Sequence, residues 1–303
     1  MHVVHRLKIQ IPLMRIVTMK KICWANTEKF GDAEFVVVGI PDESQSHALR
    51  KGTEDAPSKI REISNIRDSY ERNGKISLGR PFQGTEKKVH DLGDIPRNQI
   101  KSTFEKIVAS SKIPISIGGD HSITKEIIKA ISRQNEKISL VYFDAHPDFV
   151  SSHRNYYGSV ITDVLSHVEI ESSLQIGIRT PEEEELENLK KYHLDVITPF
   201  DIQKQGLQNI SKSILDKLGK NVYVSFDMDC IDPSFAPGVS VPVPLGLSSI
   251  DCIYLLQRIA QKGIIGMDIM EVCPSFDIKD RTSHLASRLI SEVLYSSGDN
   301  YGG

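Results

Sequence analysis

Acidic and histidine side chains of this 303-residue chain gather directly after short apolar runs. In chain order they are His121 after residues 113–117, Asp144, His146 and Asp148 after residues 140–143, and Asp227 and Asp229 after residues 222–226. Alternate side chains of extended backbone point the same way, so the members of each cluster can converge on one point. The glycine pair at 118–119 predicts a turn that brings His121 to the end of its run.

Four aspartates and two histidines in one half-buried cleft predict a metal centre. Crowded carboxylates repel and raise one another's pKa values unless cations compensate them. The set exceeds the three protein ligands of a usual catalytic zinc site, and an oxygen-rich set with imidazoles suits a pair of harder ions such as Mn²⁺. Two such ions about 3.5–4 Å apart can hold a hydroxide between them and so supply a nucleophile at neutral pH.

Each cluster alone has an ordinary structural explanation. An Asp-x-Asp pair such as Asp227 and Asp229 is usually a loop or helix-cap device, and His121 after two glycines could be a turn residue. Three polar groups on one side of a strand end are costly without a partner, which makes residues 144–148 more specific. The three clusters together favour metal binding.

From residue 33 onward, apolar β-branched runs alternate with stretches of helical periodicity, which predicts βα units and a parallel sheet. Strands are expected at 33–40, 113–117, 138–143, 174–178, 222–226 and 263–270, and helices at 99–111, 122–133, 181–192 and 248–261. Two of these helices follow capping signatures, at 180–183 and 248–251. Because α/β folds build their sites at the carboxyl ends of parallel strands, the three clusters fall where a site is expected.

The composition excludes several classes of protein. With 37 Lys+Arg against 40 Asp+Glu and a net charge of −3, the chain has no basic excess for a nucleic-acid or anionic-membrane partner. No run approaches the roughly 18 apolar residues of a membrane-spanning helix. The four cysteines form no CxxC pair, which indicates a reducing, cytoplasmic location. Residues 1–22 are expected to be a leader, disordered or an over-extended start, followed by a single domain at 23–303.

Several longer motifs resemble the ureohydrolase family of arginases, agmatinases and relatives. The matching segments are residues 39–42, 56–61, 118–122, 144–148, 225–238 and 270–272. The resemblance implies a three-layer αβα fold with a mostly parallel central sheet. It also implies an enzyme with two Mn²⁺ per chain that hydrolyses a guanidino substrate and releases urea. It also implies a trimer or hexamer.

The resemblance also assigns roles to the candidate residues. Asp144 and Asp227 would bridge both metals, with His121 and Asp148 completing one site and His146 and Asp229 the other. Glu271 would anchor the guanidinium group through a bidentate pair. Asp148 would hydrogen-bond the hydroxide and pass its proton to the leaving amine. The alternative for Glu271 is a surface salt bridge at a strand end.

Two segments depart from the family pattern. Where relatives carry a His-Gly pair, this chain has Tyr157-Gly158; Tyr157, or His153 four residues earlier, is therefore a candidate for the catalytic role of that histidine. The run 238–246 is bulkier than the family's and would line the entrance. Agmatine, cleaved to putrescine and urea, is the favoured substrate. The alternatives are an arginase or guanidinobutyrase type, a catalytically weak metal-binding relative, and a single-zinc deacetylase-type amidohydrolase.

Overall fold

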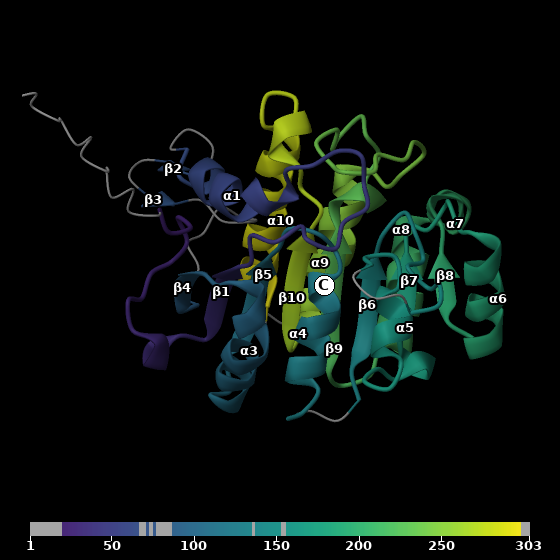
Figure 1. Ribbon diagram of the computed structural model, residues 1–303, viewed down its shortest axis with the longest axis horizontal. Coiled ribbons are helices and arrows are strands. Elements are labelled where there is room, and N and C mark those ends of the chain that lie inside the picture. Colours follow the sequence, from purple (N-terminus) through teal and green to yellow (C-terminus); the bar gives the residue numbers. More distant parts are fainter. Residues whose placement is uncertain are drawn as a thin grey trace, which may run out of the picture.

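Eight parallel strands form the central sheet of the computed structural model, which describes residues 20–66, 71–72, 75–76, 87–134, 137–152 and 156–297 (Figure 1). The strands are β1 (Phe35–Gly39), β4 (Val89–Asp94), β5 (Ile113–Ile117), β6 (Ser139–Phe143), β7 (Leu174–Ile176), β8 (Asp195–Ile197), β9 (Val222–Asp227) and β10 (Gly266–Met270). Their order across the sheet is β4-β1-β5-β10-β9-β6-β7-β8. A separate antiparallel pair consists of β2 (Glu71–Arg72) and β3 (Lys75–Ile76).

Helices cover both faces of this sheet. They are α1 (Ala56–Ser64), α3 (Ile100–Ala109), α4 (Ile123–Ile131), α5 (Val160–Val164), α6 (Glu183–Tyr192), α7 (Pro199–Gln205), α8 (Leu207–Lys217), α9 (Ser249–Lys262) and α10 (Arg281–Ser296). On one face, Val37 and Val224 share a hydrophobic core with α1, α8, α9 and α10. On the other, Val36 and Leu140 share a core with α3, α4, α5 and α6. The predicted three-layer αβα fold is therefore confirmed.

The four central strands position the candidate residues. β5, β10, β9 and β6 are consecutive in the sheet, and because they are parallel their carboxyl ends lie at one edge. His121 follows β5, Glu271 follows β10, Asp227 ends β9, and Asp144 follows β6. Segments up to 150 residues apart in the chain are thereby brought together.

Both edge strands lie outside the predicted set. β4 has the sequence VHDLGD and β8 has only three residues, and each pairs with one neighbour. An edge strand is partly exposed, so it does not need the continuous apolar run on which the prediction depends. The strand predicted at 263–270 begins only at Gly266, because Gly263, with a φ of 106°, ends α9.

The helix predictions differ mainly at their ends. α6 begins later than predicted, with Glu182 as N-cap in a reciprocal capping box with Glu185; the hydroxyl of Thr180 instead donates to the carbonyl of Ala145 at 3.3 Å. The capping box predicted at Ser248 is present. Helices α1, α5, α7, α8 and α10 lie outside the four predicted ranges.

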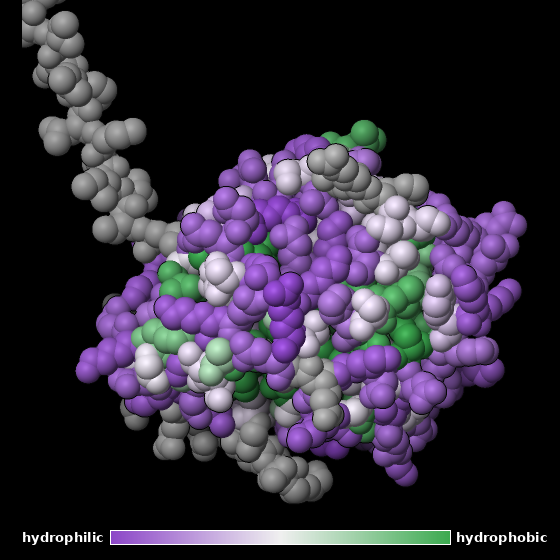
Figure 2. Space-filling model, turned by 60° about the horizontal axis from the view of Figure 1, so that its bottom comes forward, coloured by the Kyte–Doolittle hydropathy of each residue, from purple (hydrophilic) through white to green (hydrophobic). Residues whose placement is uncertain are grey.

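The face shown in Figure 2 is largely hydrophilic, with hydrophobic residues gathered in a few patches. Among the described residues, no helix combines the length and apolar character needed to cross a membrane. Residues 1–19 of the expected leader lie outside the described part. Ile22, the last residue of the expected leader at 1–22, is described: it is 2% exposed, and its amide donates to Asp91 at 2.7 Å.

Candidate metal centre

The turn between β5 and α4 sets the position of His121. Here the amide of Asp120 donates to the carbonyl of Asp42 at 3.0 Å, and the backbone of Gly119 packs against that same carbonyl. A Cβ on Gly119 would collide with the carbonyl oxygen, so the close approach of the two loops requires glycine. His121 consequently lies buried, 1% exposed, at the edge of the sheet.

The segment after β6 carries three of the candidate ligands. The amide of His146 donates to Oδ1 of Asp144 at 2.6 Å, and the amide of Ala145 donates to Oδ1 of Asp229 at 3.0 Å. Asp148 has a φ of 47°, in the left-handed region that non-glycine residues rarely adopt. Such strained backbone persists only where the surrounding structure holds it in place, and it is found most often at functional sites.

Asp227 and Asp229 come from the end of β9. Oδ1 of Asp227 accepts a hydrogen bond from the amide of Asp229 at 2.7 Å, which caps a single 3-10 turn, Met228–Cys230. Both carboxylates are 3% exposed. This is the capping arrangement foreseen for an Asp-x-Asp pair, but it engages only one oxygen of Asp227.

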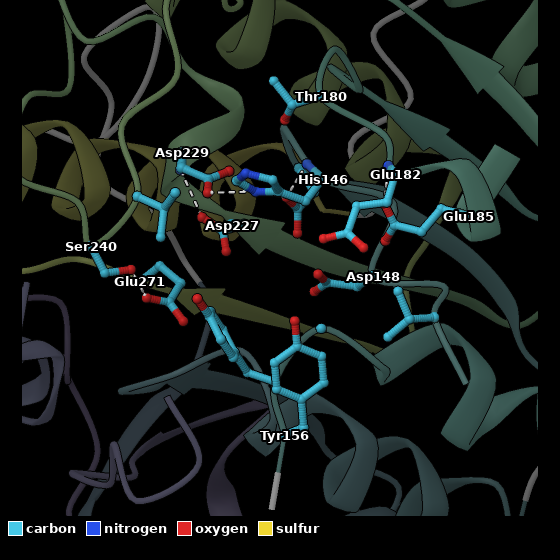
Figure 3. Close-up of a pocket in the computed structure, with 15 residues that line it drawn as sticks. His146, Asp148, Tyr156, Thr180, Glu182, Glu185, Asp227, Asp229, Ser240 and Glu271 are labelled. Carbon is cyan, nitrogen blue, oxygen red and sulfur yellow. Dashed lines mark hydrogen bonds and ion pairs between the residues drawn. The ribbon is translucent and has the colours of Figure 1, made fainter. Parts of the chain in front are cut away.

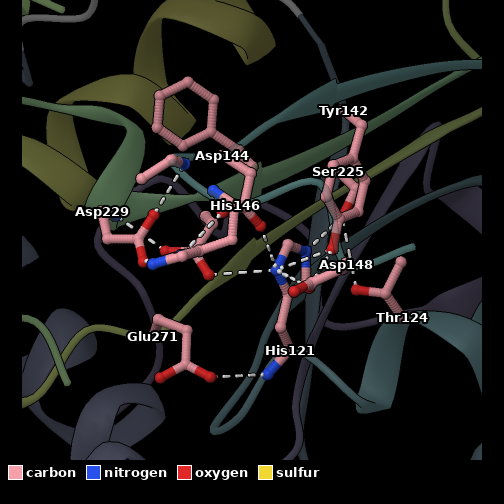
Figure 4. Close-up of polar contacts among 12 residues, drawn as sticks. His121, Thr124, Tyr142, Asp144, His146, Asp148, Ser225, Asp229 and Glu271 are labelled. Carbon is pink, nitrogen blue, oxygen red and sulfur yellow. Dashed lines mark hydrogen bonds and ion pairs between the residues drawn. The ribbon is translucent and has the colours of Figure 1, made fainter. Parts of the chain in front are cut away.

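The side chains from these three segments converge, and Figure 4 labels five of the six: His121, Asp144, His146, Asp148 and Asp229. Nδ1 of His121 lies 3.0 Å from Asp144, 3.0 Å from Asp227 and 3.7 Å from Asp148. Nδ1 of His146 lies 3.2 Å from Asp229 and 3.4 Å from Asp144. Two ligand triads result, one of His121, Asp144 and Asp148 and one of Asp144, His146 and Asp229. Asp144 belongs to both.

The negative charge of this cluster shifts its pKa values strongly. Burial raises the pKa of Asp148 and of Asp227 well above the usual value, and neighbouring aspartates raise it further. Burial alone would lower the pKa of His146, but Asp229 and Asp144 raise it to about 12. Burial alone would raise the pKa of Asp144, but the neighbouring imidazoles of His121 and His146 lower it. A buried cluster of carboxylates like this one therefore requires positive charge close by.

The donor atoms fit divalent cations. Oδ2 of Asp144 is buried and accepts no hydrogen bond of normal geometry, although Nδ1 of His121 lies 3.0 Å away. This short distance without a hydrogen bond is explained if a lone pair of Oδ2 and the lone pair of Nδ1 both point at one cation. Carboxylates and imidazoles suit Mn²⁺, and the sharing of Asp144 suits a pair of ions.

Glu271 faces the same space from the end of β10. It has a φ of 64°, and its carboxylate accepts hydrogen bonds from the amide of His121 at 2.8 Å and from the hydroxyl of Ser240. Burial raises its pKa to about 8, with a further contribution from the charge of Asp120. At 1% exposure Glu271 is not a surface salt-bridge residue.

A cavity of about 160 Å³ opens above these groups (Figure 3). Its described lining residues are Asp144, His146, Asp148, Val150, Tyr156, Tyr157, Gly158, Thr180, Glu182, Glu185, Asp227, Asp229, Ser240, Val241 and Glu271. Glu182 and Glu185 lie on the side opposite Glu271 and Ser240. Ser240 and Val241 come from the run 238–246, which therefore reaches the cavity as expected.

Tyr157 lines the cavity, whereas His153 lies outside the described residues. Burial and the charge of Glu271 raise the pKa of Tyr157 above its usual value, so the phenol stays protonated. Next to it, Tyr156 packs edge-on at 5.5 Å, and the ring of His47 lies 5.1 Å from that of Tyr156. Tyr156 has no sequence signal that identifies it as a lining residue of the cavity, because it belongs to no motif.

Glu182 and Glu185 also line the cavity, although the sequence pattern at 180–185 indicates only the start of a helix. Glu185 accepts hydrogen bonds from the amides of Phe149 at 3.0 Å and Glu182 at 2.8 Å, and so joins α6 to the segment after β6. The signal that could have found them is their place at the start of the helix that follows β7, at the same edge of the sheet as the candidate ligands.

Comparisons with known proteins agree with this geometry. A family model described as "Arginase family" matches residues 33–295. An agmatinase of Neisseria meningitidis serogroup C is 31% identical over 281 residues, covering 88% of each chain. The agmatine ureohydrolase of Thermoplasma volcanium superposes with a TM-score of 0.80 at 32% identity, covering 93% of this chain and 95% of that one. A proclavaminate amidino hydrolase from Streptomyces clavuligerus gives a TM-score of 0.80 at 28% identity, covering 88% and 92%.

Proposed function

The chain belongs to the arginase family and is a hydrolase of guanidino C–N bonds, and on this premise we propose that it is a binuclear manganese enzyme that converts agmatine to putrescine and urea. The observation that carries the proposal is the sharing of Asp144 by two ligand triads beneath one cavity that Glu271 also lines. The fold alone would not support a particular substrate.

The proposed ligands are the six that converge from β5, β6 and β9. His121 and Asp148 would hold one ion, His146 and Asp229 the other, and Asp144 and Asp227 both. When bound, the pair of ions lowers the pKa of water and supplies a nucleophile at neutral pH. Manganese is proposed because carboxylate and imidazole ligands without thiolates suit it.

The chain's own residues would orient the substrate and move a proton. A guanidinium carbon is a poor electrophile because its positive charge is delocalised, so its position must be fixed closely. Glu271, oriented by Ser240 and the amide of His121, would pair with two guanidinium N–H groups. A carboxylate oxygen of Asp148 would carry the proton to the leaving amine. The protonated phenol of Tyr157 would donate a hydrogen bond in place of the family histidine.

The charge of the cavity favours agmatine over other guanidino compounds. Seven carboxylates line it, those of Asp144, Asp148, Asp227, Asp229, Glu182, Glu185 and Glu271, and its described lining contains no lysine or arginine. Even two divalent cations would leave such a lining with excess negative charge. Agmatine carries a cation at each end, whereas arginine and guanidinobutyrate carry a carboxylate that this lining would repel.

A urea assay on the Mn²⁺-loaded protein tests the proposal. We expect urea from agmatine, with slower release from arginine and guanidinobutyrate. The variant Glu271→Gln should keep its bound Mn²⁺ but lose at least about 30-fold in kcat/KM, because the guanidinium loses its buried ionic partner. Preferential turnover of arginine or guanidinobutyrate would move the assignment within the family. Two bound Mn²⁺ without turnover of any guanidino compound between pH 7 and 10 would identify a weak metal-binding relative, and one Zn²⁺ per chain a deacetylase-type centre.

The compartment and the oligomeric state of the protein are also part of the proposal. The four cysteines are all free thiols, which supports a reducing, cytoplasmic compartment in which the enzyme would supply putrescine for polyamine biosynthesis. A homo-oligomer, a trimer or hexamer, is proposed from the family resemblance. Light scattering on the Mn²⁺-loaded protein would decide between these states and a monomer.

A further inference from the structure

Tyr142 is a buried side chain that contacts two of the proposed ligands. It lies on β6, two residues before Asp144, and is 1% exposed. Its hydroxyl donates to Oδ2 of Asp148 at 2.6 Å and lies 3.1 Å from Nδ1 of His121 (Figure 4). Residues of an apolar strand are usually core, and the sequence gives no sign that this one reaches the ligand cluster.

The ring of Tyr142 also fixes the plane of His121. The two rings stack at a centroid distance of 4.7 Å and an interplanar angle of 2°. On the far side of the imidazole, Nε2 lies 2.9 Å from Oγ of Ser225, which donates its own proton to Asp268 at 2.8 Å. Since that hydroxyl proton is committed, Nε2–H is the donor to Ser225, and Nδ1 keeps its lone pair for the ligand cluster.

The hydroxyl of Tyr142 has one proton for two acceptors. Asp148 is the nearer one, and a charge-assisted hydrogen bond to a carboxylate is stronger than one to a neutral imidazole. Asp148 needs such a bond, because its backbone has a φ of 47° and it belongs to no helix or strand. The bond uses one lone pair of Oδ2, the oxygen that also lies 3.7 Å from Nδ1 of His121, and leaves the other lone pairs of the carboxylate for a cation.

We propose that Tyr142 is a positioning residue of the metal centre, which holds Asp148 by one oxygen and keeps the His121 ring in its binding orientation. The inference rests on the two-metal centre of the proposed function but not on the substrate. It predicts that the hydroxyl of Tyr142 strengthens cation binding through Asp148. The phenol does not contact the substrate, since Tyr142 is not among the described residues that line the cavity.

The chain offers a matched control in Tyr223. This tyrosine lies on the neighbouring strand β9, is 0% exposed, and donates to Oδ2 of Asp268 at 2.7 Å. Asp268 belongs to neither ligand triad and keeps hydrogen bonds from Ser225 and Thr124 when Tyr223 is changed. The variants Tyr142→Phe and Tyr223→Phe therefore each remove one buried hydroxyl from the same sheet, and only the first removes one from a proposed ligand.

The test is a titration of each metal-free protein with Mn²⁺, in which free Mn²⁺ is followed by electron paramagnetic resonance. Wild type and Tyr223→Phe should bind two Mn²⁺ per chain with equal affinity, and Tyr142→Phe should bind one of the two about 10- to 100-fold more weakly. In an Asp148→Asn background, Tyr142→Phe should cause no further loss, because the hydroxyl acts through that carboxylate.

Three results would overturn the proposal: unchanged Mn²⁺ affinity in Tyr142→Phe, an equal loss in the Asp148→Asn background, or a Tyr142→Phe chain that circular dichroism shows to be unfolded. A wild type that binds no Mn²⁺ would overturn it together with the proposed function. A wild type that binds two Mn²⁺ but releases no urea would overturn the proposed function alone, and the comparison of the two tyrosine variants would still decide the role of Tyr142.

Discussion

Ser240 donates its hydroxyl hydrogen bond to Oε2 of Glu271, and the two side chains are 5% and 1% exposed. Oε1 of the same carboxylate accepts from the amide of His121 at 2.8 Å. Both oxygens are therefore oriented by the protein, and each keeps a second lone pair for a ligand. Because burial raises the pKa of Glu271 while the bond from Ser240 lowers it, this serine helps to keep the carboxylate ionised.

Replacement of Ser240 tests that relationship. The variant Ser240→Ala should reduce kcat/KM for agmatine about tenfold or more, since a hydrogen bond to a buried charged group contributes about 1.5–3 kcal/mol. The effect should appear mainly as a higher KM if Glu271 binds substrate and transition state alike. Ser240→Thr keeps the hydroxyl and serves as the control. Steady-state kinetics in which both variants behave like wild type would contradict this role.

The sequence predicted the six proposed metal ligands because their types and spacing carry the signal. Asp-x-His-x-Asp and Asp-x-Asp after apolar runs need only alternation and the rule that parallel strands end at one edge. That rule does not give the strand order, so the adjacency of β5, β10, β9 and β6 comes from the structure alone. Tyr142 could not be predicted, because a tyrosine in an apolar strand is usually a core residue. Glu182 could not be predicted either, because its position is typical of a helix cap.

The ion pair of Asp163 with Lys125 gives a prediction about pH. The two charged groups lie 3.2 Å apart, and Lys125 also donates to the carbonyl of Tyr156 at 3.3 Å, which ties α4 to the residue that lines the cavity. Burial alone would raise the pKa of Asp163, but the hydrogen bond from Ser152 and the charge of Lys125 lower it. The ionised carboxylate therefore stabilises the folded state.

The sign of the pH dependence follows from that lowered pKa. The stabilisation is fully present above the unfolded-state pKa of about 3.9 and is lost as the pH falls below that value through the folded-state pKa. Asp163→Asn should cost about 1–2 kcal/mol at pH 7. Urea unfolding of both proteins should show this difference shrinking below pH 4. A difference that is as large at pH 3 as at pH 7 would contradict the assignment.

The adjacent glycines of the turn before His121 should respond differently to alanine. A Cβ at Gly119 meets the backbone carbonyl of Asp42, whereas a Cβ at Gly118 meets the end of the Met270 side chain, which can move. Gly119→Ala should therefore destabilise the protein by about 2–3 kcal/mol, and Gly118→Ala by less. Thermal unfolding of the two metal-free variants provides the measurement. Equal losses would mean that the backbone contact does not control the turn.

The guanidinium of Arg179 holds the loops that carry Asp229 and the cavity entrance. It donates to the carbonyls of Asp229 at 2.8 Å and Pro244 at 3.0 Å, and to those of Gly177, Cys230 and Val243. Lysine has three donors on one nitrogen and cannot reach five carbonyls spread around a planar group. Arg179→Lys should therefore loosen both loops although the charge is kept.

We expect two separable effects of Arg179→Lys. The free energy of unfolding should fall by about 2 kcal/mol, since the carbonyls of the buried residues Asp229 and Gly177 lose this donor. The affinity for Mn²⁺ should also fall, because the carboxylate of Asp229 loses the support of its own backbone. Urea unfolding with and without Mn²⁺ distinguishes the two effects: the loss should be larger with the metal present. A loss of equal size in both conditions would mean that Arg179 serves the fold without supporting the metal centre.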